Sequence, residues 1–555
     1  MPLAPFLRWF FPRNCQYAIS RSLFIRGVGF VYLIAIASWW VQAEALIGKD
    51  GLVPAADYLQ RVGDYFDEQG ESRFWNVPTL LWISSSDEFI AGICALGMAL
   101  AFLVIAGFVP GPCLLGLWVV YLSLVNTGSV FMSFQWDILL LETTILTVLV
   151  APWSVVRMRW RNPPPLGAGE RLVWWLCWIA VAKLMFQSGW VKLAWATPSQ
   201  SEWWPDHTAL TFHYMTQPIP TWTAWWMHQL PEWLQKASLW PMYGIELILP
   251  FLVFLGARLR LAAGSGFVVL MMLILVTGNY AYFNWLTLVL CLPLVADRFW
   301  SLPRRSIAWL RGRLGKRPTS NAGNIGEQNK QAAVSTNRLL QNTSLAVRAL
   351  PLTLIALLNF TVFFNDLYRV SQISYLENPV LPWTHLKVDP TPEWADELHG
   401  KLSPFNLVSG YGLFRSMTTD RPEIIIEGSS DGVEWQEYDV RWKPDKLDAP
   451  PRFVAPHQPR VAWQFWFAAL ERQYHPRSRN ATWMARLFRG LLENDPVALS
   501  FFNDNPFPDH PPKILRARLF LYEFTTIKER RESGNWWKRE LAGDYLPAIT
   551  KSAFQ

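Results

Sequence analysis

Ionisable side chains occur inside apolar segments of this sequence, where a charge requires a partner. Lys183 and Lys192 lie nine residues apart in one such segment, and the carboxylates Asp137, Glu142 and Glu246 lie in others. An ionised group inside a bilayer is costly unless it is paired or hydrated. The five groups therefore predict either structural ion pairs that hold helices together or a polar cavity that faces a ligand.

The second interpretation gathers polar residues near the outer ends of several predicted helices. The direction of each helix places these residues on one side of the membrane. His213, beside Tyr214, is a candidate acid or base there, because imidazole titrates near neutral pH. The residues predicted to line the cavity are Gln135, Asp137, Glu142, Lys183, Gln217, Glu246, Asn279 and Tyr280.

Signatures of several other chemistries are absent from the sequence. His207, His213 and His228 are spaced by six and fifteen residues, which matches no standard zinc site. The sequence contains no GxSxG elbow, phosphate loop or GxGxxG motif, and its five cysteines include no CxxC pair. We therefore expect no metal site, and no cofactor is evident from a motif.

The composition is that of a membrane protein with a soluble part. Apolar residues make up 51% of the 555 residues and charged residues only 17%, below the roughly 25% of soluble proteins. The mean hydropathy of +0.13 is too low for a chain that lies entirely in a membrane. The net charge of +7 comes from cations between apolar segments, where they orient a membrane protein, so nucleic-acid binding is not favoured.

The apolar segments predict a polytopic α-helical bundle of about nine transmembrane helices. Several segments are shorter than the roughly 20 residues that cross a bilayer, so we expect kinked, tilted or partly re-entrant helices among them. The predicted spans are 24–46, 89–109, 114–132, 138–150, 172–193, 242–255, 262–277, 280–295 and 350–364.

The positions of arginine and lysine predict the orientation of this bundle. Short cytoplasmic loops retain these residues, and nine crossings from a cytoplasmic N-terminus place the basic stretches 157–161, 258–260 and 298–348 on the inner side. The loop 195–241 and the chain after residue 366 then lie outside.

Two segments of the transmembrane domain, residues 1–366, have unusual compositions. Nine of the 33 tryptophans fall between Trp190 and Trp240, and tryptophan favours the boundary between membrane and water. Residues 195–241 are therefore predicted to form a tryptophan-rich outer loop. Residues 316–342 are polar and rich in Gly, Asn, Gln and Ser, which is typical of a flexible linker.

Residues 367–555 predict an extramembrane domain. Short alternating runs at 422–427, 436–442 and 516–525 are typical of β-strands, and the sequence GSSDG at 428–432 provides turn residues between the first two. We expect a small antiparallel β-rich domain, sandwich-like, with a few helices.

Several long stretches resemble the lipase maturation factor family. FQWDILLLE (134–142), SGWVKL (188–193) and TALTFHYMTQPIPTWTAWWMHQLP (208–231) are similar to its membrane part. PFNLVSGYGLFRSMTTDRPEIIIEGSSDGVEWQEYDVRWKP (404–444) and PHQPRVAWQFWFAAL (456–470) are similar to its C-terminal domain, in the same order. The resemblance covers nearly the whole chain apart from the linker.

This resemblance implies a membrane protein that brings certain lipases to their folded, active form. In animals the family belongs to the endoplasmic reticulum, whereas the composition here suits a bacterial member in the inner membrane, with its C-terminal domain in the periplasm. The implied partners are membrane lipids and an exported, lipase-like client that the extramembrane domain engages. The implied client-binding residues are Tyr411, Phe414, Arg421, His457, Trp463 and Trp466.

A second resemblance offers an alternative function. SGWVKL followed by a tryptophan and TAL is similar to the membrane core of vitamin K-dependent gamma-carboxylases, in which a lysine of the KL pair acts as a base. Lys192 holds that position here, but Ala194 stands where that family has an acidic residue. The alternative is an enzyme that acts on or with a quinone-like lipid, with Lys192 and His213 as catalytic residues.

Overall fold

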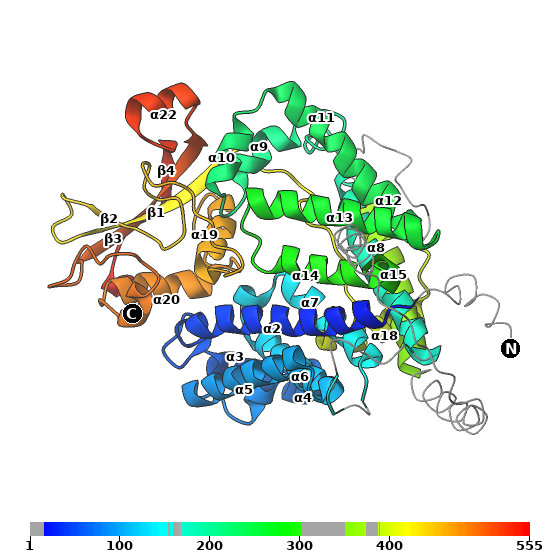
Figure 1. The fold of residues 1–555 in the computed structure, drawn as a ribbon. Helices are drawn as coiled ribbons and strands as arrows, with labels where there is room; N and C mark the ends of the chain where they lie inside the picture. Colours follow the sequence, from blue (N-terminus) through cyan, green and yellow to red (C-terminus); the bar gives the residue numbers. More distant parts are fainter. Residues whose placement is uncertain are drawn as a thin grey trace, which may run out of the picture.

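The structure is a computed structural model that describes residues 16–153, 156–158, 166, 168–300, 350–372, 387 and 389–554. The predicted linker 316–342 lies outside the described residues. The long helices α2 and α13 lie on either side of the shorter α14, and a β-sheet stands at one end of them (Figure 1). The chain is therefore built from a helical bundle and a β-containing domain.

Six helices of the described chain are long and apolar enough to cross a membrane. Their lengths follow from uninterrupted apolar sequence and clear end signals: Ser86 accepts a hydrogen bond from the Phe89 amide where α5 begins, and Gly107, with a φ of 83°, ends it. The six are α2 (Ala18–Ile47), α5 (Asp87–Ala106), α6 (Pro110–Thr127), α8 (Ala168–Ala194), α13 (Ala257–Thr277) and the helix Leu350–Gln372.

The other three predicted spans form shorter elements, so the count of nine transmembrane helices is not confirmed. They contain α7 (Gln135–Val150), the run α11 (Glu232–Tyr243), η3 (Gly244–Ile248) and α12 (Leu249–Leu252), and α14 (Phe283–Cys291) with η4 (Leu292–Leu294). Pro241 and Pro250 lie on either side of η3, which is a π-helix. Proline removes a backbone donor, which explains the irregular helix there.

The two ends of the bundle have different neighbours. At one end, Arg21 lies 2.9 Å from Glu170, and Arg26 donates to the Met158 carbonyl at 2.6 Å. The opposite end, where α2 and α13 finish and α7 begins, carries the C-terminal domain (Figure 1). The assignment of the end that holds Arg21 and Arg26 to the cytoplasm remains a prediction.

The tryptophan-rich segment 195–241 is mainly helical. It contains α9 (Ala209–Thr216), α10 (Trp222–His228) and most of α11, and Thr221 caps α10 by accepting from the Ala224 amide. Trp225 packs inside, beside the sheet. The exposed tryptophans of α10 and α11 are Trp222, Trp226, Trp233 and Trp240.

Short elements connect the long helices of the described chain. They are α3 (Ala55–Gln69), α4 (Arg73–Asn76), η1 (Leu80–Trp82), η2 (Ser129–Met132), α15 (Asp297–Trp300), α18 (Glu393–Leu402) and η6 (Ser403–Phe405).

The C-terminal domain contains an antiparallel sheet of four strands in the order β2-β1-β3-β4. The strands are β1 (Arg421–Ser429), β2 (Gln436–Tyr438), β3 (Ile514–Phe524) and β4 (Trp537–Thr550). The predicted strands at 422–427 and 516–525 are confirmed as β1 and β3, and the run at 436–442 yields only the short β2. The predicted turn is also present, because Asp431 Oδ1 accepts from the amides of Val433 and Glu434.

The expected sandwich is wrong for the described residues, which form this single sheet. Helices cover it instead of a second sheet: α19 (Arg460–Leu470) packs on β1, and Met215 and Trp225 of the membrane domain pack against Ile425. Every residue of β1 is buried as a result. The other helices are α20 (Ala481–Leu491), α21 (Pro496–Leu499), α22 (Ile527–Ser533) and η7 (Lys551–Phe554).

Candidate functional site

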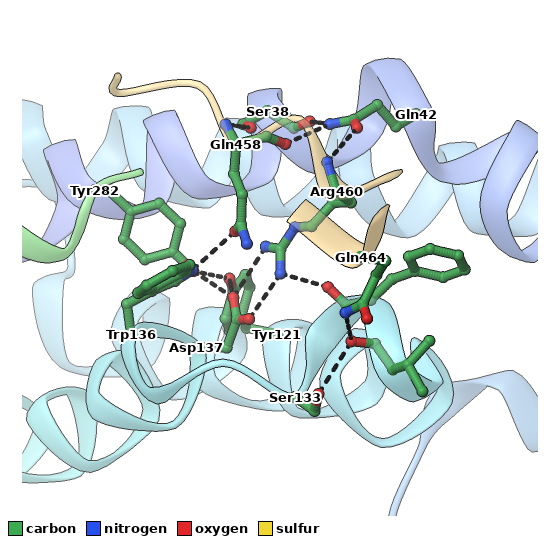
Figure 2. A network of polar contacts seen from close by, with 12 residues as sticks. Ser38, Gln42, Tyr121, Ser133, Trp136, Asp137, Tyr282, Gln458, Arg460 and Gln464 are labelled. Carbon is green, nitrogen blue, oxygen red and sulfur yellow. Dashed lines mark hydrogen bonds and ion pairs between the residues drawn. The ribbon is translucent and has the colours of Figure 1, made fainter. Parts of the chain in front are cut away.

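A buried ion pair joins the C-terminal domain to the membrane bundle. Arg460, at the start of α19, donates to the two Asp137 oxygens at 2.7 and 3.0 Å, and both side chains are 0% exposed (Figure 2). Tyr121 donates to the same carboxylate at 2.7 Å, and Tyr282 also donates to it. These partners compensate a charge that burial alone would make very costly.

The guanidinium of Arg460 stays charged in this environment. Burial disfavours its charge, but the Asp137 carboxylate and its hydrogen bonds outweigh burial and raise the pKa of Arg460 above its ordinary value. The same guanidinium donates to the carbonyl of Phe131 at 2.6 Å. Arg460 therefore connects α19 to two successive elements of the bundle, η2 and α7.

Helices α2 and α7 also bind the chain that precedes α19. The Ser38 hydroxyl lies 2.9 Å from His457 Nδ1 and accepts from the Gln458 amide at 2.9 Å. Gln42 Nε2 donates to the Gln458 carbonyl at 2.9 Å, and Trp136 Nε1 donates to the Gln458 side chain at 2.8 Å (Figure 2). Residues 457 and 458 are thus fixed by two membrane helices.

A second buried pair lies deeper in the bundle. Lys183 donates to Glu142 Oε1 at 2.8 Å and to Asn359 at 2.9 Å, and both charged side chains are almost completely buried. The other Glu142 oxygen accepts from the Tyr411 hydroxyl at 2.5 Å and from the Ser409 amide at 2.9 Å. Glu142 therefore links α7, α8 and the segment that leads into the C-terminal domain.

A third connection runs through Arg421 at the start of β1. Its guanidinium donates to the carbonyls of Met215, Gln217 and Pro218 at 2.8, 2.5 and 2.9 Å. It also lies 2.6 Å from Glu423, and both side chains are buried. The carbonyls at the end of α9 lack helical partners, so Arg421 satisfies them as a helix cap would.

Asn279 provides a fourth connection through its side-chain amide. Its Oδ1 accepts from the amides of Val454 and Ala455 at 2.7 and 2.9 Å. Its Nδ2 donates to the carbonyls of Arg452 and Ile219 at 2.8 and 3.2 Å. Asn279 thus binds the C-terminal domain, in contrast to its predicted place on the wall of an open cavity.

Lys192 forms a close ion pair at the edge of the bundle. Its ammonium lies 2.7 and 2.6 Å from the two oxygens of Glu246, and both residues are buried. Gly189, one turn earlier on α8, lets Glu246 approach, because a Cβ at that position would lie 2.8 Å from the Glu246 Cβ. A lysine held by both oxygens of a carboxylate favours the structural role that the sequence left open.

His213 lies beside this pair without a direct bond to it. Burial, and after it the positive charge of Lys192, lowers the pKa of His213 to about 4. Its Nε2 is 3.5 Å from the Tyr280 hydroxyl, which donates to Gln217 at 2.8 Å. The imidazole is therefore neutral at pH 7 and a weak base there.

The space around these groups is small. A cavity of about 50 Å³ is lined by residues that include Lys192, Glu246, Tyr280 and Phe414. Ligand sites for organic molecules usually measure about 300–1,000 Å³, whereas a few water molecules fit a space of this size. The cavity beside Lys192 and Glu246 is therefore smaller than a site for a quinone-like lipid.

The structure places most of the predicted cavity residues at one interface with the C-terminal domain, whereas Glu246 pairs with Lys192 inside the bundle. Gln135, another predicted cavity residue, also faces the C-terminal domain, because its Oε1 lies 3.5 Å from the Gly412 amide. The predicted client-binding residues Tyr411, Arg421 and Trp463 are buried in this interface, and the half-buried His457 contacts Ser38. Trp466 donates to the Thr216 carbonyl at 2.8 Å, and Phe414 packs on His213. They bind the membrane domain, so they leave little free surface for a client.

Sequence reasoning missed the residues that complete the interface, namely Arg460, Gln458, Ser38 and Gln42. Arg460 is separated from Asp137 by 323 positions, a distance over which no spacing rule applies. The signal in the sequence was Asp137 itself, an acidic residue in an apolar segment with no evident partner, since a buried carboxylate needs a cation. Among the described residues, no group of three His, Cys, Asp or Glu side chains could hold a metal ion.

These features define a class of protein: an integral membrane helical bundle to which a C-terminal β-containing domain is docked by buried charges. Residues 19–302 match the lipase maturation factor transmembrane domain, and residues 407–547 match the lipase maturation factor C-terminal domain. The chain belongs to the lipase maturation factor family, which confirms the resemblance.

Relatives from vertebrates cover nearly all of the chain. Lipase maturation factor 2 of Xenopus tropicalis is 33% identical, over 96% of this chain and 83% of its own length. The human protein of the same name is 33% identical over the same shares, and human lipase maturation factor 1 is 28% identical over 96% of this chain and 88% of its own. No solved structure matches the chain.

Proposed function

We propose that this chain is a membrane-embedded maturation factor for exported proteins of the lipase class. The observation that carries the proposal is the set of buried bonds from Asp137, Glu142, Gln217 and Asn279 to the C-terminal domain. They hold that domain rigidly against the bundle. A fixed domain at one end of a membrane bundle suits the capture of a folding client more than it suits chemistry on a small molecule.

The client surface that we propose lies at the junction of α10 and the C-terminal domain. A cavity of about 280 Å³ there is lined partly by Ile219, Trp442 and the proline-rich segment 449–452. Trp442 is 41% exposed and Phe453, beside Trp222, is 46% exposed. Exposed aromatic residues around a concavity are typical of protein-binding surfaces.

Secreted lipase activity tests this function. A deletion strain is complemented with the wild-type gene, with Trp442→Ala combined with Phe453→Ala, or with the matched control Trp394→Ala, which removes an exposed tryptophan of α18. We expect the double variant to lower the activity per molecule of secreted lipase while its own membrane level stays normal, and the control to behave as the wild type. Equal lipase activity with and without the gene would refute the function.

We also propose that the C-terminal domain faces the side to which clients are exported, the periplasm in a bacterium or the lumen of the endoplasmic reticulum in a eukaryote. The support is that Arg21 and Arg26 lie at the opposite end of the bundle, where the basic loops of the sequence predict the cytoplasmic side. Alkaline phosphatase, which is active only on the exported side, should be active when fused after Tyr368 and inactive when fused after Gly323. The reverse pattern would contradict the orientation.

A further inference from the structure

An apolar groove runs along the outside of the bundle, away from the interface described above. It measures about 540 Å³ and lies between α8, α12 and the helix Leu350–Gln372. Rings from all three elements line it, and Phe251 and Phe360 are exposed. The groove has the size of a site for an organic ligand, and its position between membrane helices opens it to lipid.

The polar side chains in this groove are already bonded. Lys183 donates to Glu142 and Asn359, and Asn359 Nδ2 donates to the Ile355 carbonyl at 2.9 Å. A ligand in the groove therefore meets mainly aromatic and aliphatic carbon. A hydrocarbon chain is the occupant that such a lining favours.

A second cavity lies next to the groove, on the side of the C-terminal domain. It measures about 310 Å³ and is lined by the next turns of α8 and of the helix Leu350–Gln372. Leu367 lines both spaces. Its lining differs in kind, because it includes Asp366 and Arg415. An apolar space that leads into a charged one matches the two parts of a phospholipid.

The two charged groups of the second cavity are not paired with each other. No ion pair of Arg415 is found among the described residues, and its guanidinium lies 4.8 Å from the centre of the Trp195 ring. Asp366 Oδ2 accepts from Gln187 at 3.2 Å, which leaves the other oxygen available. Gly410 permits this arrangement, since a Cβ there would lie 1.4 Å from Asp366 Oδ2.

We propose that these spaces bind one phospholipid with a phosphoethanolamine headgroup. Its phosphate binds Arg415, its primary ammonium donates to Asp366, and an acyl chain occupies the groove. Guanidinium recognises phosphate oxygens well, and a carboxylate accepts hydrogen bonds from a primary ammonium but not from a quaternary one. A phosphoglycerol headgroup would offer Asp366 no cation.

The same lipid would contact both parts of the protein. Gly410 and Arg415 lie in the same segment as Tyr411, whose hydroxyl donates to Glu142. Asp366 belongs to the membrane helix Leu350–Gln372. A bound phosphoethanolamine lipid therefore stabilises the docked arrangement of the two domains. This inference does not depend on the identity of the client.

Lipid analysis of the purified full-length chain tests the proposal. The protein is reconstituted in nanodiscs with equal parts of phosphatidylethanolamine, phosphatidylcholine and phosphatidylglycerol, extracted, and examined by native mass spectrometry for bound lipid. We expect the ethanolamine lipid to be enriched at least about 5-fold over the other two, a difference of roughly 1 kcal/mol. Arg415→Glu and Ala356→Trp, which fills the groove, should each abolish the enrichment.

Arg479→Ala, at an exposed arginine of the C-terminal domain, is the matched control and should retain the enrichment. Tryptophan fluorescence verifies that each variant is folded, and because Arg415 is exposed, Arg415→Glu remains informative even if Ala356→Trp fails to fold. Wild-type lipid that mirrors the nanodisc composition, enrichment of another headgroup, or unchanged enrichment in Arg415→Glu would overturn the proposal.

Discussion

Removal of Arg460 should release the C-terminal domain from the bundle. In Arg460→Met, the buried Asp137 keeps the hydroxyls of Tyr121 and Tyr282 but loses its cation, whose two bonds measure 2.7 and 3.0 Å. Breaking one partner of a buried ion pair costs about 3–5 kcal/mol. Each 1.4 kcal/mol is tenfold in an equilibrium, so the undocked state should become roughly 10² to 10⁴ times more populated.

Hydrogen exchange of the α19 amides measures this population. If α19 exchanges through undocking, its rates should rise by the same roughly 10² to 10⁴ factor under conditions in which reclosing is fast. The matched control is Arg472→Ala, which removes an arginine from the exposed pair with Asp420, where the two side chains are 45% and 43% exposed. That pair contributes about 0–1 kcal/mol, so the control should change exchange less than about tenfold.

A double substitution separates the ion pair from general damage. Asp137→Leu added to Arg460→Met removes the uncompensated carboxylate, and Tyr121 and Tyr282 can still bond to each other. Replacement of both partners of a buried pair is often nearly neutral, so the double variant should exchange more slowly than Arg460→Met alone. Exchange in Arg460→Met no faster than in Arg472→Ala would refute the reasoning.

Three further results are expected. Lys192→Arg should preserve protein level and function because it keeps the charge opposite Glu246, whereas Lys192→Ala should lower the membrane level by leaving a carboxylate unpaired, at about 3–5 kcal/mol; loss of function at a normal level in both variants would favour the catalytic role. Tyr411→Phe should lower the unfolding free energy by about 1–3 kcal/mol through the lost bond to Glu142, and an unchanged denaturant midpoint would contradict this. His213 has a pKa lowered to about 4 in the folded chain, so the unfolded chain, with a histidine pKa near 6.5, binds more protons below that pH; stability should fall as the pH drops from about 6.5 to 4, and His213→Gln should remove that part of the slope.

Charge burial made part of the site predictable. Carboxylates and lysines in apolar segments had to find partners, and the pairs Glu142 with Lys183 and Glu246 with Lys192 connect segments that were identified from the sequence. The partner of Asp137 was not predictable in this way. It comes from the C-terminal domain, and only the folded topology brings α19 to α7.

Some strands were predictable from the local sequence, and others were not. The run Ile424–Ile426 consists of β-branched residues before the turn at 428–432, which favours a strand, and α19 and the membrane domain bury β1. Strand β4 gave no such signal. It contains Gly543, its pairing with β3 has register shifts, and much of it is exposed, so its sequence lacks a regular alternation.

The predicted count of nine transmembrane helices is not confirmed, and the difference has a physical reason. Hydropathy detects apolar composition, but it does not report where a helix is interrupted, as at the π-helical residues between Pro241 and Pro250. Such short elements are tolerated in a membrane protein when neighbouring protein satisfies their backbone groups. The hydropathy of such segments predicts transmembrane spans, although the helices in them are too short to cross a bilayer as single regular helices.

A map at side-chain resolution of the full-length chain in a nanodisc tests the docked arrangement most directly. We expect density for the Arg460 guanidinium against the Asp137 carboxylate, with α19 packed on the end of the bundle where α7 begins. A C-terminal domain that is separated from the bundle, with Asp137 facing water or a different cation, would contradict it.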